Sequence, residues 1–168
     1  MAIKVFDLEF DDECYFIKRP SIVQTIEFDN RTFYAKFECV KESLTKLVIQ
    51  QHQNRDFTIA TPLIQNNQVR YMLMEYDGDE AIRFSYLIKS ILSQLGYKKF
   101  YIYQGKNEYK IQVFIKVNNL SLSQSSKKLE SISNLLLEKL NKKWKLLPSQ
   151  NLPYEYNIAT LPYKELTF

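Results

Sequence analysis

The sequence predicts an α+β fold whose core follows the order β-α-β-β-α-β over residues 68–161. Three observations carry this prediction: apolar residues on both faces of residues 69–76, a helical apolar stripe over residues 84–95, and two runs rich in aromatic and β-branched residues at 100–104 and 109–116. A strand that is apolar on both faces is typical of the centre of a sheet. We therefore expect residues 69–76 to lie in the middle of the core sheet.

The first helix of this core follows Asp77-Gly78, a pair that ends the strand. Asp79 is predicted to cap the helix, with Glu80 in its first turn, because carboxylates stabilise the positive end of the helix dipole. Gly96 suits the left-handed residue that follows a helix end. We expect the helix to occupy the residues between Glu80 and Gly96.

The second half of the core contains another helix, predicted from apolar residues at helical spacing: Leu129, Ile132, Leu136 and Leu140. The tail from Trp144 onward contains Pro148, Pro153 and Pro162 and is not expected to be helical. Within it, residues 154–160 are predicted to form the last strand, at an edge of the sheet. The resulting order is that of ferredoxin-like and RNA-recognition domains.

Residues 1–62 are predicted to add an N-terminal α/β layer. Its expected elements are a bulged strand at 3–10, a hairpin at 22–39 that turns at Asp29-Asn30, a helix at 41–53 and a strand at 57–60. A chain of 168 residues has the length of one domain. We therefore expect residues 1–168 to form a single domain with these two parts.

The composition excludes several kinds of site. Only 3 glycines occur, in neither a GxxxxGK nor a GxGxxG pattern, which argues against a glycine-rich phosphate loop. The one histidine, His52, excludes a multi-histidine metal centre and is expected on the surface. Cys14 and Cys39 are expected to be reduced, buried thiols, with a disulfide as the alternative. No segment resembles a membrane span or a secretory signal, so we expect a cytoplasmic protein.

An acidic cluster at the end of the central strand supplies the candidate catalytic residues: Glu75, Asp77 and Asp79. Glu75 and Asp77 are two residues apart on a strand, so their side chains point the same way and can share a magnesium or manganese ion. Asp79 joins them if the turn folds back. The alternative is structural, with Asp79 beginning a helix and the other two carboxylates at a solvated strand end. The pair is then at most a weak metal site, and no cofactor is required.

The lysines predict a different kind of site. The formal net charge is +4, with acidic residues gathered near the N-terminus and lysines in the later half of the chain. Beside the loop at 104–110, Lys106 and Lys110 are candidates for phosphate contacts, and Tyr103 and Tyr109 are candidates for stacking on bases. The alternative is a solvated lysine-rich surface without a ligand.

The order of elements and two short motifs resemble the prim-pol fold of archaeo-eukaryotic-type primases. That family has two acidic residues, separated by one, at the end of the first core strand, and MEYDGD places Glu75 and Asp77 there. Its later SGxxGxH loop corresponds to QGKNEYK, in which Gln104 replaces the serine, Glu108 the second glycine and Lys110 the histidine. The family's third acidic residue has no counterpart that we can place. The chain also resembles, over most of its length, a small epsilonproteobacterial family with this general fold and no established activity.

Two functions follow from these observations. The resemblance implies metal-dependent nucleotidyl transfer, but Lys110 cannot act as a neutral imidazole and is a poor base at neutral pH. We therefore expect a catalytically degenerate prim-pol-like domain that binds nucleic acid or a protein partner, and no enzymatic activity. The alternative is a divergent metal-dependent nucleotidyltransferase of the primase or polymerase kind. The sequence leaves the ligand and the oligomeric state open.

Overall fold

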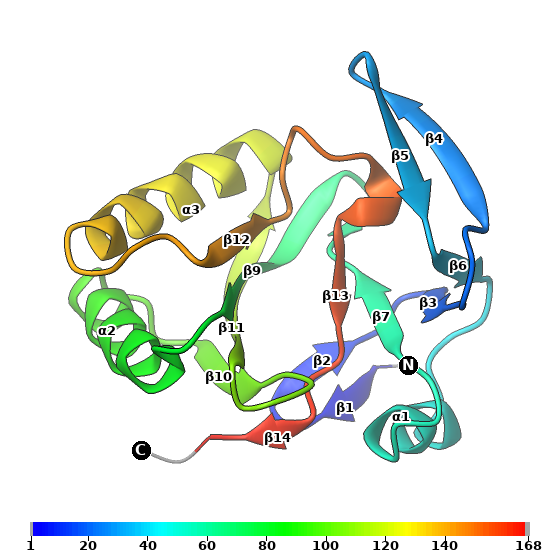
Figure 1. The fold of residues 1–168 in the computed structure, drawn as a ribbon, viewed down its shortest axis with the longest axis horizontal. Coiled ribbons are helices and arrows are strands. Elements are labelled where there is room, and N and C mark those ends of the chain that lie inside the picture. The colour runs from blue at the N-terminus through cyan, green and yellow to red at the C-terminus, as the bar shows by residue number, and fades with distance from the viewer. Residues whose placement is uncertain (1, 167–168) are drawn as a thin grey trace.

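The computed structural model describes residues 2–166 and contains two main antiparallel sheets, with helices α2 and α3 on the outer face of the first (Figure 1). The first sheet has the order β12-β9-β11-β10-β14, and β8 pairs with β9. Its strands are β8 (Ile64–Gln65), β9 (Gln68–Asp77), β10 (Phe100–Gln104), β11 (Lys110–Leu120), β12 (Trp144–Leu147) and β14 (Lys164–Glu165). Helix α2 (Ala81–Gln94) joins β9 to β10, and α3 (Leu122–Leu137) joins β11 to β12. This is the predicted β-α-β-β-α-β order, with β9 inside the sheet.

The last strand of this core differs from the prediction. Residues 154–160 were expected to fill that position, but β12 fills it and pairs with β9, from Trp144 opposite Tyr76 to Leu147 opposite Leu73. Trp144 and Leu147 are buried while Lys145 is exposed, and Pro148 follows the strand end. Residues 154–160 instead form a short 3-10 helix, η1 (Tyr154–Tyr156), and β13 (Ile158–Thr160), which pairs with β7 of the second sheet.

The N-terminal layer is built around the second sheet, of order β13-β7-β3-β6. Its other strands are β3 (Tyr15–Lys18), β6 (Phe37–Val40) and β7 (Ile59–Pro62). Two ribbons flank it, one of β1 (Ile3–Val5) with β2 (Leu8–Phe10) and one of β4 (Gln24–Phe28) with β5 (Arg31–Ala35). The second ribbon projects from the body (Figure 1) and turns, as predicted, at Asp29 and Asn30, whose φ angles are 51° and 59°. Helix α1 (Lys46–Gln53) starts later than expected, because Thr45 caps it by accepting the Val48 N–H.

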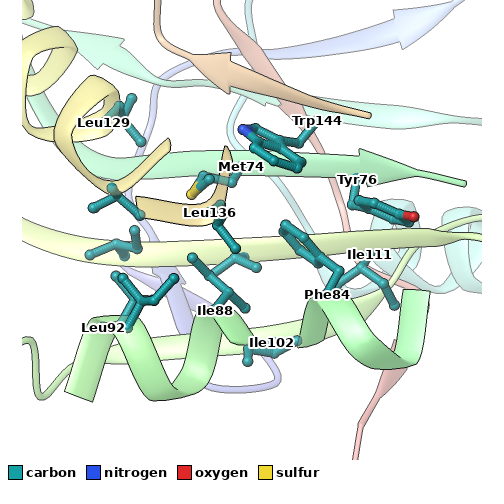
Figure 2. Close-up of a cluster of buried hydrophobic side chains, with 14 of the residues drawn as sticks. Met74, Tyr76, Phe84, Ile88, Leu92, Ile102, Ile111, Leu129, Leu136 and Trp144 are labelled. Carbon is teal, nitrogen blue, oxygen red and sulfur yellow. The ribbon is translucent and has the colours of Figure 1, made fainter. Parts of the chain in front are cut away.

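Both faces of β9 are covered, which explains its apolar sequence. Met74 and Tyr76 face α2 and α3, where they pack with Phe84, Ile88 and Trp144 (Figure 2). Phe84 is fully buried and stacks on Tyr76 with ring centroids 4.6 Å apart. Burial of one such side chain contributes about 1.5–3 kcal/mol. On the other face, Tyr71 and Leu73 join a second buried cluster with residues of the N-terminal layer, so the two layers share a core.

Several local expectations need correction. Asp79 does not cap α2: the N-cap residue is Glu80, whose side chain makes no capping hydrogen bond. His52 is fully buried, not on the surface. Of the two thiols, which are free, Cys14 is half-buried and Cys39 is exposed.

Gly96 does occupy the left-handed position predicted for it, with φ +88°. No described helix has both the length and the apolar character of a membrane span.

The burial of His52 connects α1 to the C-terminal segment. Its Nδ1 accepts the Ile59 N–H at 3.0 Å, and its Nε2 lies 2.8 Å from the Leu161 carbonyl oxygen. An imidazole that accepts at Nδ1 and donates from Nε2 is neutral. Burial lowers the His52 pKa, which agrees with this tautomer. The ring also stacks on Tyr163 at 4.2 Å between centroids, and Tyr163 reaches the cleft described next.

Candidate functional site

A cleft with a volume of about 490 Å³ lies between the two sheets. The first sheet supplies the end of β9, the starts of β11 and β12, and the loops that precede these two strands. The opposite wall comes from the N-terminal layer and the C-terminal segment, through Lys18, Phe37, Thr58, Thr160 and Tyr163. The site therefore requires parts of the chain that are far apart in the sequence.

The two candidate metal ligands reach this cleft together. Glu75 and Asp77 both line it. Alternate residues of β9 share a face, and Tyr71 and Leu73 on that face pack against the N-terminal layer. The same face therefore carries Glu75 and Asp77 toward the second sheet, as the spacing of two predicted.

Lysines lie next to both carboxylates. Lys110 of β11 pairs with Asp77 in the strand register, and its Nζ is 3.9 Å from Asp77 Oδ2. Glu75 is flanked by Gln112 on β11 and Lys145 on β12. Burial raises the Glu75 pKa, and the charges of Lys145 and Lys110 oppose that shift. Each carboxylate is thus partly neutralised by protein cations.

Asp79 is directed away from the other two acids. It does not line the cleft but an adjacent groove beside α2, and Lys143 Nζ donates to its Oδ1 at 3.1 Å. This hydrogen bond lowers the Asp79 pKa. Gly78 makes the arrangement possible, since a Cβ there would lie 2.7 Å from Lys143 Cδ. The three acids therefore do not converge.

Six lysines line the cleft, against the two carboxylates. They are Lys18, Lys106, Lys110, Lys142, Lys143 and Lys145. The sequence identified Lys106 and Lys110 as candidates, and both are there. It missed the other four as site residues. Lys142, Lys143 and Lys145 were visible in the sequence only as part of its basic later half, and no local signal existed for Lys18, which belongs to the other layer.

Neither of the two candidate tyrosines lines the cleft that the lysines line. Tyr103 is only 1% exposed, and its hydroxyl accepts the Asp7 N–H at 3.2 Å, so neither face of its ring is open to a base. Tyr109 is exposed but lines the adjacent groove. An aromatic ring that the sequence did not identify, Tyr163, does line the cleft. It stacks on His52, and its ring centroid lies 4.7 Å from the Arg55 guanidinium carbon.

Gln112 forms part of the cleft wall and was not predicted. It is 4% exposed, and its Nε2 donates to the Thr160 carbonyl at 2.7 Å, which links the two sheets. Its Oε1 is buried and has no hydrogen-bond partner. A buried acceptor without a partner is uncommon and costs about 1–3 kcal/mol. A ligand with a donor group would satisfy it.

The donor set does not suit a catalytic divalent cation. Within residues 2–166, no three His, Cys, Asp or Glu side chains gather where they could hold a metal ion. The two carboxylates that share the cleft have lysine charges beside them. A cation placed between them would meet like charge from Lys110 and Lys145. We therefore assign no chemical step to a metal.

Comparisons with known proteins agree with the fold. Residues 1–70 match the family described as Domain of unknown function (DUF1882). No curated protein matches the sequence. Among solved structures, the chain is similar to the polymerase domain of Mycobacterium tuberculosis Ligase D, determined in complex with DNA, with a TM-score of 0.52 and 10% identity. The similarity covers 90% of this chain and 68% of that one. At this identity it shows a prim-pol-like fold and no more.

Proposed function

We propose that the protein binds nucleic acid in the cleft between the two sheets and contacts the phosphate backbone of the nucleic acid. This binding requires no metal ion, and the protein catalyses no reaction on the bound strand. The observation that carries this proposal is the convergence of six lysines from both layers on one cleft. Lysine ammonium groups that neutralise phosphates release condensed counterions, and this release dominates sequence-independent binding.

The size of the cleft favours a single strand. Its volume of about 490 Å³ is within the range of ligand pockets, about 300–1,000 Å³, which suits a nucleotide-sized segment. A single strand can place one nucleotide there and continue past the lysines on either side. A duplex is wider and stiffer and would reach only the rim. We therefore expect single strands to bind more tightly than duplexes.

The alternative function, metal-dependent nucleotidyl transfer, is favoured by one observation: Glu75 and Asp77 share a face that opens into the cleft. The neighbouring side chains argue against it. The strand partners of these acids are Gln112, Lys110 and Lys145, so the adjacent strands supply amide and ammonium groups where a metal site needs carboxylates.

Fluorescence anisotropy with single-stranded and duplex oligonucleotides, in EDTA and over a salt series, tests the proposal. If all six lysines contact phosphates, the slope of log K against log salt is about −4 for a single strand. A paired substitution, Lys106→Gln with Lys142→Gln, should reduce that slope by about 1.4, because neither lysine is held in an ion pair with a described residue.

The matched control is Lys127→Gln with Lys128→Gln on α3, which removes the same charge from exposed positions outside the cleft. It should leave the slope unchanged. If the wild-type protein binds no oligonucleotide even at low salt, the lysines are a solvated surface and a protein partner becomes the leading function. If both pairs reduce the slope equally, binding is not localised to the cleft.

A further inference from the structure

The two cysteines lie together at the edge of the second sheet, outside the lysine cleft. Cys39 is in β6, the edge strand, and pairs with Phe16 of β3. Cys14 immediately precedes β3. Alternate strand residues share a face, so Cys14 is a diagonal neighbour of Cys39 on the face that carries Phe16.

The two thiols and one phenol lie close together. Cys14 and Tyr154 line the same pocket, and the pKa of the Cys14 thiol responds to both Cys39 and the Tyr154 hydroxyl. Tyr154 belongs to η1 and packs on Phe16 with ring centroids 6.2 Å apart, which holds its hydroxyl near the thiols. Both cysteines are free, and Cys39 is the exposed one. The cluster is therefore a reduced dithiol with one accessible sulfur and a phenol beside the other.

We propose that Cys14 and Cys39 form a reversible modification site that reacts with low-molecular-weight disulfides and closes to an intramolecular disulfide. The Cys39 thiolate attacks one sulfur of the small disulfide, forms a mixed disulfide and releases one small thiolate. The Cys14 thiolate then attacks the Cys39 sulfur, forms the bond between the two cysteines and releases the second small thiol. One small disulfide is consumed, two small thiols are produced, and the protein loses two hydrogens.

The surroundings assign the order of attack. Burial raises the pKa of the Cys14 thiol, the nearby Cys39 adds to this shift, and the Tyr154 hydroxyl opposes it. The raised pKa leaves a smaller fraction of Cys14 as thiolate, and its sulfur is the less accessible of the two. Cys14 therefore acts second, when Cys39 is already activated as a mixed disulfide. A hydrogen bond from Tyr154 favours the Cys14 thiolate that this second step needs.

The bond would close a loop that contains the projecting β4–β5 ribbon. A cross-link of this kind stabilises the folded state by constraining the unfolded chain. Diagonal neighbours lie about 7–8 Å apart, so closing the bond requires a small backbone shift. Cys14 lies outside the strand ladder and β6 is at the sheet edge, so few ladder hydrogen bonds oppose that shift. At the other end of the same two strands, Lys18 and Phe37 pair with each other and line the cleft.

The test is intact mass spectrometry of the full chain after reaction with glutathione disulfide under native conditions. The wild-type protein should lose two hydrogens and both titratable thiols, proteolysis should recover a peptide that joins Cys14 to Cys39, and the thermal midpoint should rise. A protein that retains glutathione on both cysteines, or that forms disulfide-linked dimers instead, would overturn the proposal.

Variants test the assigned order. Cys14→Ser should stop at one glutathione adduct on Cys39, whereas Cys39→Ser should react much more slowly. Tyr154→Phe should slow loop closure, so that the mixed disulfide accumulates, while Tyr156→Phe serves as its control because the Tyr156 hydroxyl donates to the Tyr34 carbonyl. Equal rates of adduct formation in the two single-cysteine variants would contradict the assigned order, and an unlinked wild-type protein would refute the site itself.

Discussion

Replacing Asp77 with Asn is expected to strengthen binding to nucleic acid. Asp77 lies 3.9 Å from Lys110, and their side chains are 66% and 45% exposed. The carboxylate therefore competes with phosphate for the same ammonium group. Removing it leaves Lys110 free to contact the backbone. If binding depended on a metal ion, Asp77→Asn would instead weaken it, because the substitution removes one of the two carboxylate ligands.

The magnitude follows from the exposure of the pair. Exposed ion pairs contribute about 0.2–1 kcal/mol, so releasing Lys110 should increase affinity by a factor of about 1.4 to 5, since 1.4 kcal/mol corresponds to a factor of ten. If Asp77 keeps Lys110 from the phosphates in the wild-type protein, the wild-type slope falls short of the six-lysine value by about 0.7 for a single strand, and Asp77→Asn should restore that difference. Both effects should be largest at low salt, because salt screens exposed charges.

The assay is oligonucleotide anisotropy in EDTA and again with manganese. The matched control is Asp29→Asn in the β4–β5 turn, which removes the same charge far from the cleft at a φ of 51° that Asn tolerates well. An increase confined to Asp77→Asn supports the proposed cleft. Weaker binding by Asp77→Asn in EDTA would refute the reasoning, and an equal increase in both variants would show that only net charge matters.

Three further predictions concern Asp12, the metal and catalytic activity. Burial raises the pKa of Asp12 from 3.8 to about 6, and the charge of Arg70 opposes the shift. The folded protein therefore holds the Asp12 carboxyl proton more tightly than the unfolded chain does. As a result, the folded state loses stability as pH rises from about 4 through 6. Asp12→Asn should therefore stabilise the protein by up to about 3 kcal/mol at pH 8 and have no effect below pH 4 in urea titrations; a destabilised variant at pH 8 would contradict this. Calorimetry with manganese should show weak or no binding at Glu75 and Asp77, and primer assays should give no template-dependent product. Tight binding that Asp77→Asn abolishes, or a product lost in Asp77→Ala, would restore the catalytic alternative.

Local patterns predicted the elements whose signals are local. The two apolar faces of residues 69–76 identified the central strand, and the Asp29-Asn30 pair identified the hairpin turn. Gly96 was placed correctly because the left-handed backbone after a helix favours glycine. These features depend on a few adjacent residues, whose conformational preferences act without the rest of the fold.

Tertiary contacts decided the features that the sequence did not predict. The β12 strand is short and precedes a proline, so residues 154–160 looked like the better final strand; pairing with β9 and burial of Trp144 outweighed that pattern. His52 sits in a polar stretch, and only the fold brings the Ile59 N–H and the Leu161 carbonyl to its ring. Lys18 joins the cleft because the second sheet packs against the first, a contact with no local signature.

The lysine charges in this cleft favour a bound anion and disfavour a bound metal ion. An ammonium group and a divalent cation near 4 Å repel by about 2 kcal/mol even in a medium as polar as water, and by several times more in a partly buried site. Lys110 and Lys145 therefore oppose a metal between Glu75 and Asp77 while attracting phosphate. We expect a bound polyanion to change that balance, because its phosphates would draw the lysines away from the carboxylates. The weak manganese binding expected above therefore applies to the free protein, and any metal affinity should increase when nucleic acid is bound.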